Sequence, residues 1–364
     1  MTRHNVYRLL DRLRDFGIEL NGRWDQPPDS CRRRDEHQGI VKRSGTLKTQ
    51  NGMVMHTQAA NRQREAANWW PSKYGPDDEA GALNEISSSK VLEAVGLVQG
   101  GRVYDLAHVL HAEIPAFPGR TFRQYLTTNY HQINRRSGHA GPDGLGRNSV
   151  NWIVEQVTAT QQIGTHMDGL NHLQRGDRTY NGFGLREIIE DYGTNRLGID
   201  TLPQVVTRGL LADVAVARGG ERLEQGEVVT VADAEAALAG AGLDVRPGDA
   251  VFFHTGWGGL WGADNQRYAG GEPGPGMALG EWLADHQVAL SGCDTWSFGP
   301  YPPEDPDEPF VVPQTLNVRH GVVVVENLRL EEIAREGVHE FMLVISHAKL
   351  RGATGAWVAP LAIV

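Results

Sequence analysis

The sequence of 364 residues has few cysteines and no long apolar segment. Its two cysteines, Cys31 and Cys293, are too few for a disulfide framework, which favours a reducing compartment. No apolar run approaches the length that spans a bilayer, and we predict no signal peptide before the core. We therefore expect a cytoplasmic protein that has no membrane partner.

Several common catalytic and binding motifs are also missing. The sequence has no Gly-x-Ser-x-Gly elbow, and neither cysteine has a recognisable histidine partner, so covalent acyl-enzyme chemistry lacks support. No phosphate-binding or dinucleotide-binding glycine motif follows a predicted strand. The formal net charge of −10 argues against general nucleic-acid affinity, because the phosphate backbone would be repelled. A small molecule is the expected partner.

The first 52 residues differ from the rest in charge. They hold 11 Lys and Arg against 7 Asp and Glu, a balance of +4 that leaves −14 for the remainder. Apolar residues between Asn5 and Phe16 recur at helical spacing, and the polar stretch that follows is typical of disorder. A DNA-binding arm is one interpretation of this basic leader. We favour the other, in which residues 1–65 are a disordered or dispensable extension.

Strand-like and helix-like segments alternate from residue 66 to residue 364, which predicts a single α/β catalytic domain. Helical composition and capping residues predict helices over 87–97, 231–241 and 276–286. Short apolar or alternating runs predict strands over 103–110, 149–157, 210–214, 250–253, 288–291, 322–325, 341–345 and 359–364.

The segment from residue 162 to residue 172 is the most informative about function. It reads Gln-Ile-Gly-Thr-His-Met-Asp-Gly-Leu-Asn-His. In an extended segment Gln162, His166 and Asp168 would project to one side. Imidazole with carboxylate suits a divalent ion such as Zn²⁺ or Mn²⁺. His172 lies four residues beyond Asp168, where it would act as a base or as a ligand. The alternative is a strand end that is merely rich in polar residues.

These residues resemble the His-x-Gly-Thr-His-x-Asp-x-Pro-x-His signature of the metal-dependent cyclase family, which includes bacterial kynurenine formamidases and isatin hydrolases. Two positions depart from the signature, because Gln162 replaces the first His and Leu170 replaces the Pro. Further segments resemble the longer members of the family in the expected order: 68–75, 103–110, 115–118, 254–257, 272–274, 292–294, 326–328 and 351–355.

The resemblance implies a swivelling β/β/α fold, a mixed sheet with flanking helices, in a homodimer or homotetramer. It also implies that Glu326 helps to form the metal centre with a His twelve residues earlier, a position that is Gln314 here. With glutamine at two histidine positions, we expect one ion rather than two. The expected ligands are Gln162, His166, Asp168, His172 and Glu326. An amide oxygen favours Mn²⁺, while the family also permits Zn²⁺.

Other candidates lie at the ends of predicted strands. His254 is expected either to line the pocket or to bond a backbone carbonyl, and Asp294 to orient a ligand histidine. Glu272 would form a pocket wall or a structural turn. Aromatic residues form either a wall for a flat substrate or part of the core: Trp257, Trp261, Trp296 and Phe298.

Together these features predict metal-assisted hydrolysis of a C–N bond in an amide, formamide or lactam, with His172 and Glu326 as the catalytic candidates. The ion would lower the pKa of a water molecule and polarise the carbonyl, while His172 transfers the proton. Thr165 or a backbone N–H of the Gly164–Thr165 turn would stabilise the oxyanion, by about 3 kcal/mol. The alternatives are a lactone hydrolase or cyclase, and a non-catalytic protein that binds metal or ligand, which the two glutamines would favour.

Overall fold

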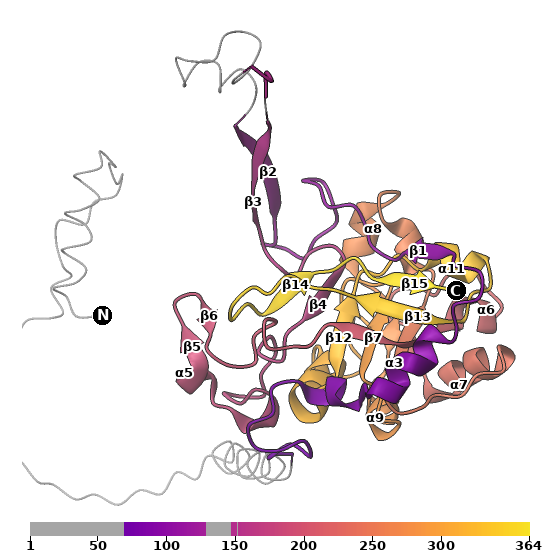
Figure 1. Cartoon of the computed structure of the whole chain (residues 1–364). Helices are drawn as coiled ribbons and strands as arrows, with labels where there is room; N and C mark the ends of the chain where they lie inside the picture. The colour runs from indigo at the N-terminus through magenta and orange to yellow at the C-terminus, as the bar shows by residue number, and fades with distance from the viewer. Residues whose placement is uncertain (1–68, 129–146, 151) are drawn as a thin grey trace, which may run out of the picture. The chain divides into compact units, whose positions relative to one another are not determined.

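The computed structural model describes residues 69–128, 147–150 and 152–364 (Figure 1). The amphipathic helix expected near the N-terminus and the extension over residues 1–65 lie outside the described residues. Within the described ranges, no helix combines the length and the apolar character needed to cross a membrane.

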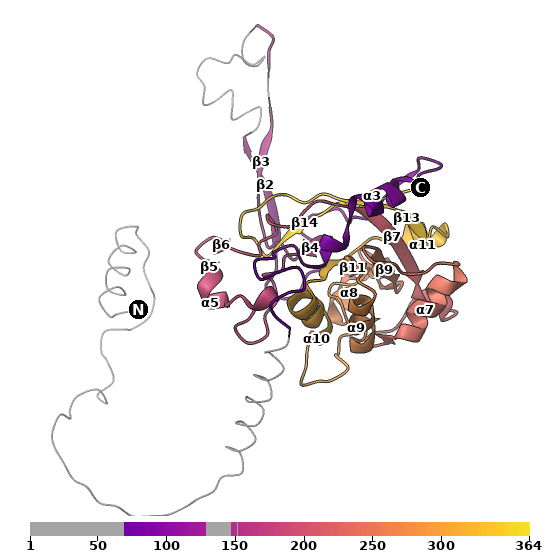
Figure 2. The same cartoon turned by 60° about the horizontal axis from the view of Figure 1, so that its bottom comes forward.

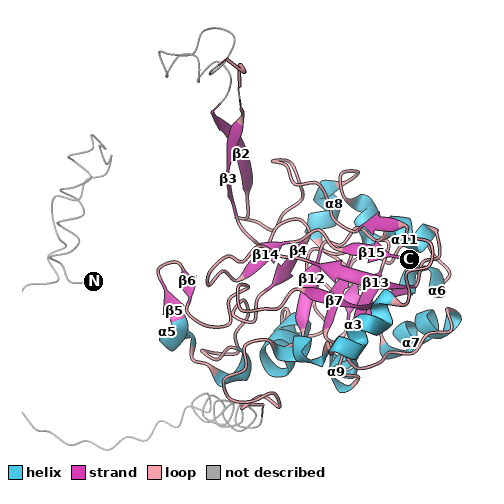
Figure 3. Cartoon of the chain, viewed as in Figure 1, coloured by secondary structure: helices cyan, strands magenta, loops and turns pink. Residues whose placement is uncertain are grey.

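A mixed sheet with flanking helices organises the described part of the chain, which confirms the expected α/β class (Figures 1 and 3). Its strand order is β1-β15-β13-β7-β9-β11-β12-β4-β14. The strands are β1 (Val103–Asp105), β4 (His166–Asp168), β7 (Val205–Asp213), β9 (Ala250–His254), β11 (Leu290–Cys293), β12 (Val323–Glu326), β13 (Glu340–Ile345), β14 (Gly355–Trp357) and β15 (Leu361–Ile363). Strands β7, β9, β11 and β12 run parallel, whereas β4 pairs antiparallel with β12 and β14.

The parallel strands are buried on both faces, because their sequences are nearly continuous apolar runs. Alternate side chains of β9 enter two separate core clusters. Phe252 packs in one cluster with Leu211 and Val323, and Phe253 packs in the other with Val324. Since parallel strands end at one edge of the sheet, the polar residues at their carboxyl ends are brought to that edge.

Helices flank this sheet, as the turned view in Figure 2 shows. They are α3 (Ser88–Val95), α5 (Leu185–Ile188), α6 (Val214–Ala217), α7 (Val231–Gly240), α8 (Asn265–Gly270), α9 (Met277–Asp285), α10 (Val311–Thr315) and α11 (Glu331–Arg335), with short 3-10 or π turns η2 (Gly81–Glu85), η3 (Tyr180–Gly182), η4 (Trp257–Leu260) and η5 (Leu316–His320). A reciprocal cap starts α7, because Thr230 accepts from the N–H of Asp233 and Asp233 accepts from that of Thr230. Leu238 of α7 and Leu279 of α9 pack in the same core cluster.

Most predicted elements correspond to observed ones, but two strands differ. The segment 103–110 pairs only as far as Asp105, because its antiparallel partner β15 begins at Leu361, opposite Asp105. The segment 149–157 was expected to form a strand. The strand observed there, β3 (Val154–Ala159), pairs with β2 (Phe122–Thr128) in a separate ribbon that stands away from the sheet in both views (Figures 1 and 2). The remaining strands form two further pairs, β5 (Ile189–Glu190) with β6 (Gly193–Thr194) and β8 (Val228–Val229) with β10 (Gly274–Pro275).

Candidate metal centre

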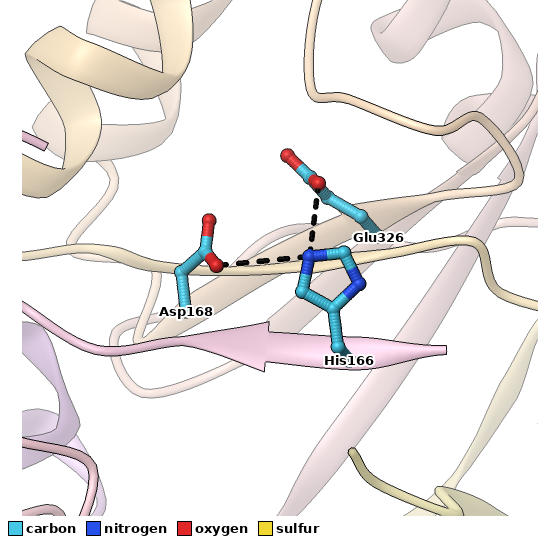
Figure 4. A group of neighbouring side chains, drawn as sticks. All are labelled: His166, Asp168 and Glu326. Atoms are coloured by element: carbon cyan, nitrogen blue, oxygen red, sulfur yellow. Dashed lines mark ion pairs between the residues drawn. The ribbon is translucent and has the colours of Figure 1, made fainter. Parts of the chain in front are cut away.

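Two adjacent strands bring one imidazole and two carboxylates together. His166 and Asp168 lie two residues apart on β4, so they share a face of the strand. Glu326 ends β12 directly opposite His166 in the antiparallel register. Nε2 of His166 lies 3.2 Å from Oε2 of Glu326 and 3.7 Å from Oδ1 of Asp168 (Figure 4). All three side chains are buried, and their ligand atoms lie within 4.8 Å of one another.

The orientation of the His166 ring leaves Nε2 facing the carboxylates. Its Nδ1 lies 2.8 Å from the carbonyl oxygen of Gly164, which can only accept, so Nδ1 carries the proton. Nε2 of His166 and Oδ1 of Asp168 are buried without a hydrogen-bond partner. Burial lowers the pKa of His166, but Glu326 and Asp168 outweigh burial and raise it above its ordinary value. The cluster therefore attracts a cation, and its donor set fits a divalent ion such as Mn²⁺ or Zn²⁺.

The backbone turn before β4 changes the expected position of Gln162. Gly164 has a φ of 62°, and a Cβ there would lie 2.1 Å from a methyl group of Leu110. Of the three residues expected on one face, only His166 and Asp168 belong to β4. The extended alternation predicted from Gln162 onward is therefore wrong. Gln162 still lies beside Asp168, because a Cβ on Gly355 would be 2.8 Å from Nε2 of Gln162 and 3.5 Å from Oδ1 of Asp168.

The amides of Gln162 and Gln314 are used within the fold. Nε2 of Gln162 donates to the hydroxyl of Thr354, which leaves Oε1 as the amide atom that can bind an ion. Nε2 of Gln314 donates to the carbonyl of Gln174 over 2.7 Å, and Gln174 in turn donates to the carbonyl of His172. Gln314 is therefore linked to the backbone of His172 through Gln174.

His172 lies at the edge of the cluster. Its Nε2 is 4.0 Å from Oδ2 of Asp168, and its side chain is 22% exposed, whereas that of His166 is fully buried. His172 is therefore more accessible to a bound molecule than His166 is.

Thr165 joins two strands instead of facing a substrate. Its hydroxyl accepts from the backbone N–H of His108 and donates to the backbone carbonyl of Asn327 over 2.6 Å. The hydroxyl proton is therefore not available to an oxyanion, and that part of the sequence-based expectation is wrong. Because Asn327 follows Glu326, this bond fixes the spacing between the two strands that carry the cluster.

Glu272 is fully buried near the same edge of the sheet. Its Oε2 accepts from the backbone N–H groups of Trp296 and Ser297, while Oε1 has no hydrogen-bond partner. Burial, assisted by the charge of Glu326, raises the pKa of Glu272 well above its ordinary value. Glu272 thus holds a turn, as one of its two predicted roles required.

Asp294 and Trp257 have structural partners. Asp294 accepts from the backbone N–H groups of Thr255 and Gly258, rather than from a ligand histidine as the sequence analysis expected. Trp257 is fully buried in an aromatic cluster, and Phe298 is fully buried in the main core. These two aromatic residues therefore belong to the core and form no exposed wall.

His254 pairs with Asp213, a residue that the sequence analysis did not single out. The two are opposite in the register of β7 and β9, and Nδ1 of His254 lies 2.9 Å from Oδ1 of Asp213. Burial lowers the pKa of His254, but the Asp213 hydrogen bond and the charge of Asp294 outweigh it and raise the pKa. Asp213 ends an apolar run, which is the pattern that identified Glu326, so the same signal could have found it.

Replacing Asp213 by Asn is expected to lower the pKa of His254, because the imidazolium loses its nearest carboxylate while burial remains. The stabilisation from a raised histidine pKa is present below the unfolded value and is lost as the pH rises through the folded value. An NMR titration of the ring protons measures this pKa in both proteins. Asp77→Asn, which removes an exposed partner of Arg196, is the control. An unchanged His254 pKa in Asp213→Asn would contradict this assignment.

Comparison with known proteins identifies the family. The sequence model of the Cyclase family matches residues 104–300. Among solved structures, a novel cyclase is 26% identical, with a TM-score of 0.71 over 82% of this chain and 99% of that chain. Isatin hydrolase A from Labrenzia aggregata is 20% identical, with a TM-score of 0.55 over 76% of this chain and 99% of that one. The Ralstonia solanacearum isatin hydrolase A is 16% identical, with a TM-score of 0.54 over 88% and 99%.

The last two likenesses show a shared fold. Among curated proteins, none matches this sequence. The family match covers more than half of the chain and includes β4, which carries His166 and Asp168. The chain belongs to the Cyclase family.

Proposed function

We propose that this protein is a metal-dependent hydrolase that opens a C–N bond in an amide, formamide or lactam. The observation that carries the proposal is the buried, unpartnered pair of atoms Nε2 of His166 and Oδ1 of Asp168 beside the Glu326 carboxylate. Leaving such atoms unpaired in the interior is costly, and a divalent ion would satisfy them together. The oxygen-rich set, with Oε1 of Gln162 available, favours Mn²⁺ over Zn²⁺.

In this proposal the buried residues would hold the ion, and the partly exposed His172 would transfer protons. A divalent ion held there would lower the pKa of water and polarise a carbonyl group. Nε2 of His172, partly exposed, takes the proton of the attacking water and returns it to the leaving nitrogen. Asp168 lies 4.0 Å from Nε2 of His172, and Glu326 contacts His166 on the adjacent strand.

Acid release from a panel of carbonyl compounds tests this proposal. The neighbours named isatin hydrolase make isatin, a cyclic amide, the first substrate to test. Formanilide serves as the open-chain amide for comparison, and an unsubstituted lactone serves as the cyclic ester. We expect the C–N substrates to be hydrolysed faster than the lactone. The reverse order would favour the lactone hydrolase alternative, and release of water from an open acid would favour a cyclase.

The His172→Ala variant is expected to lower kcat by about 100-fold or more while its bound metal stays unchanged, because the proton acceptor is lost and the buried cluster is kept. Steady-state kinetics with elemental analysis of the same sample measures both quantities. His111→Ala, an exposed histidine that contacts Glu113, is the control. Unchanged turnover in metal-loaded His172→Ala would exclude this role.

The Gln162→His variant is expected to raise divalent-ion affinity by about tenfold or more, because imidazole binds Zn²⁺ and Mn²⁺ more strongly than an amide oxygen does. Competition with a chelating dye measures the dissociation constant. Gln161→His, at the neighbouring position, is the matched control. No gain in affinity would place Gln162 outside the set of metal ligands. The glutamine at this position would then no longer support the non-catalytic alternative.

A homodimer or homotetramer, a small-molecule substrate and a cytoplasmic location remain part of this proposal. Each follows from the sequence analysis, and size-exclusion chromatography with light scattering tests the first of them.

A further inference from the structure

A cleft separate from the metal centre lies at the carboxyl ends of β7 and β9. Its volume is about 750 Å³, and its lining shares no residue with the His166–Asp168–Glu326 cluster. His254 at its floor is separated from Glu326 by two strand spacings, roughly 10 Å. The volume suits a small molecule, and the carboxyl edge of parallel strands is where open α/β folds bind ligands.

The floor of this cleft holds polar atoms that the fold leaves free. Asp213 occupies Nδ1 of His254, so Nε2 is the ring nitrogen that can meet a ligand. Oε1 of Glu331 is buried and has no hydrogen-bond partner. The side chains of His254 and Glu331 both line this cleft.

The turn after β9 builds the cleft tightly around these groups. A Cβ on Gly258 would lie 2.3 Å from Oε1 of Glu331, and a Cβ on Gly256, where φ is 76°, would lie 2.1 Å from the carbonyl oxygen of Glu221. Asp294 holds the same turn in place, because its carboxylate accepts a hydrogen bond from the backbone N–H of Gly258. Glycine at these two positions therefore lets the Glu331 carboxylate and the Glu221 segment approach the floor closely.

The rim carries charges of both signs. Glu224 is paired with Arg267. In the part of the chain that the structure describes, Arg222 and Glu221 line the cleft without an ion pair to another side chain. A ligand with a single charge would pair with the groups of opposite charge and would bury the remaining groups without a partner, which is unfavourable.

We propose that this cleft binds a small zwitterion that carries one carboxylate and one ammonium group, as amino acids do. The carboxylate contacts Nε2 of His254 and the Arg222 guanidinium, and the ammonium contacts Glu331 and Glu221. The inference rests on the cleft alone and stands independently of the metal centre and of the proposed hydrolase activity.

Isothermal titration of the full chain at neutral pH tests the proposal with a length series: glycine, 4-aminobutanoate and 6-aminohexanoate. Butanoate and butylamine, which carry one charge each, are the comparison probes. We expect at least one amino acid to bind about tenfold or more tightly than both of them. Equal binding of all probes, or no binding of any amino acid, would overturn the proposal.

Two substitutions locate the binding. Glu331→Gln and Arg222→Gln are each expected to weaken the amino acid about tenfold or more. Glu332→Gln on the same helix and the exposed Arg186→Gln lie outside the lining and should change nothing. Equal weakening by the control pair would overturn the location.

A measurement on the wild type avoids any dependence on folding of the variants. The ring signals of His254 are expected to shift on addition of the amino acid that binds, and an unshifted signal at saturation would exclude this cleft. In Asp168→Ala the same shift should persist, which separates this proposal from the fate of the metal centre.

Discussion

Replacing Asp168 by alanine is expected to remove the bound divalent ion and to lower turnover by about 1000-fold or more. The change deletes one of the two carboxylates that flank Nε2 of His166 and leaves His172 without its nearest acidic neighbour. An ion that supplies several kcal/mol of transition-state stabilisation would be lost with its ligand. Elemental analysis after dialysis against Mn²⁺ and Zn²⁺, with kinetics on the same samples, measures both effects.

A second buried aspartate separates loss of the site from loss of the fold. Asp249 is fully buried but bonds to Lys90 and Arg208, so Asp249→Asn should lower stability and keep the ion. About one ion per chain in Asp168→Ala would place the metal elsewhere. No ion in the wild type after dialysis would mean that the two glutamines have dismantled the centre, and a ligand-binding role would replace the hydrolase proposal.

The parts of the site that the sequence predicts are those set by local geometry. His166 and Asp168 share a strand of three residues, so a spacing of two was enough to place them on one face. Glu326 ends an apolar run, and apolar runs become buried strands whose ends carry polar side chains. The same argument places His254 at a strand end.

The parts that sequence analysis misplaced depend on contacts between distant segments. Thr165 bonds to a carbonyl 162 residues away, and nothing in its neighbourhood shows that Asn327 will lie opposite. Asp294 likewise serves the backbone of a turn 36 residues earlier at Gly258. Gln162 lies beside Asp168 as expected, but not along an extended strand, since the left-handed Gly164 interrupts the extended backbone between Gln162 and β4. Tertiary pairing and a single glycine therefore decide these roles.

Replacing Asp249 by alanine is expected to destabilise the folded chain by about 3–5 kcal/mol, because two buried cations lose their common partner. Oδ1 of Asp249 lies 2.8 Å from Nζ of Lys90, and Oδ2 lies 2.8 Å from Nη1 of Arg208. Burial raises the pKa of Asp249 even though both cations lower it. Without this carboxylate, the cost of burying Lys90 and Arg208 is no longer offset by their pairing with Asp249. Equilibrium unfolding in denaturant, followed by circular dichroism, measures the difference.

The exposed pair of Arg267 and Glu224 provides the contrast, and Arg267→Ala should cost less than about 1 kcal/mol. Adding Lys90→Met to Asp249→Ala should recover part of the loss, because it removes from the interior an ammonium group that would keep only Glu93 as its partner. A double variant as unstable as Asp249→Ala alone would mean that lost packing, and not the weaker pairing of the Lys90 ammonium group, causes the destabilisation. Recovery would identify this network as the electrostatic link that holds α3 against β7 and the start of β9.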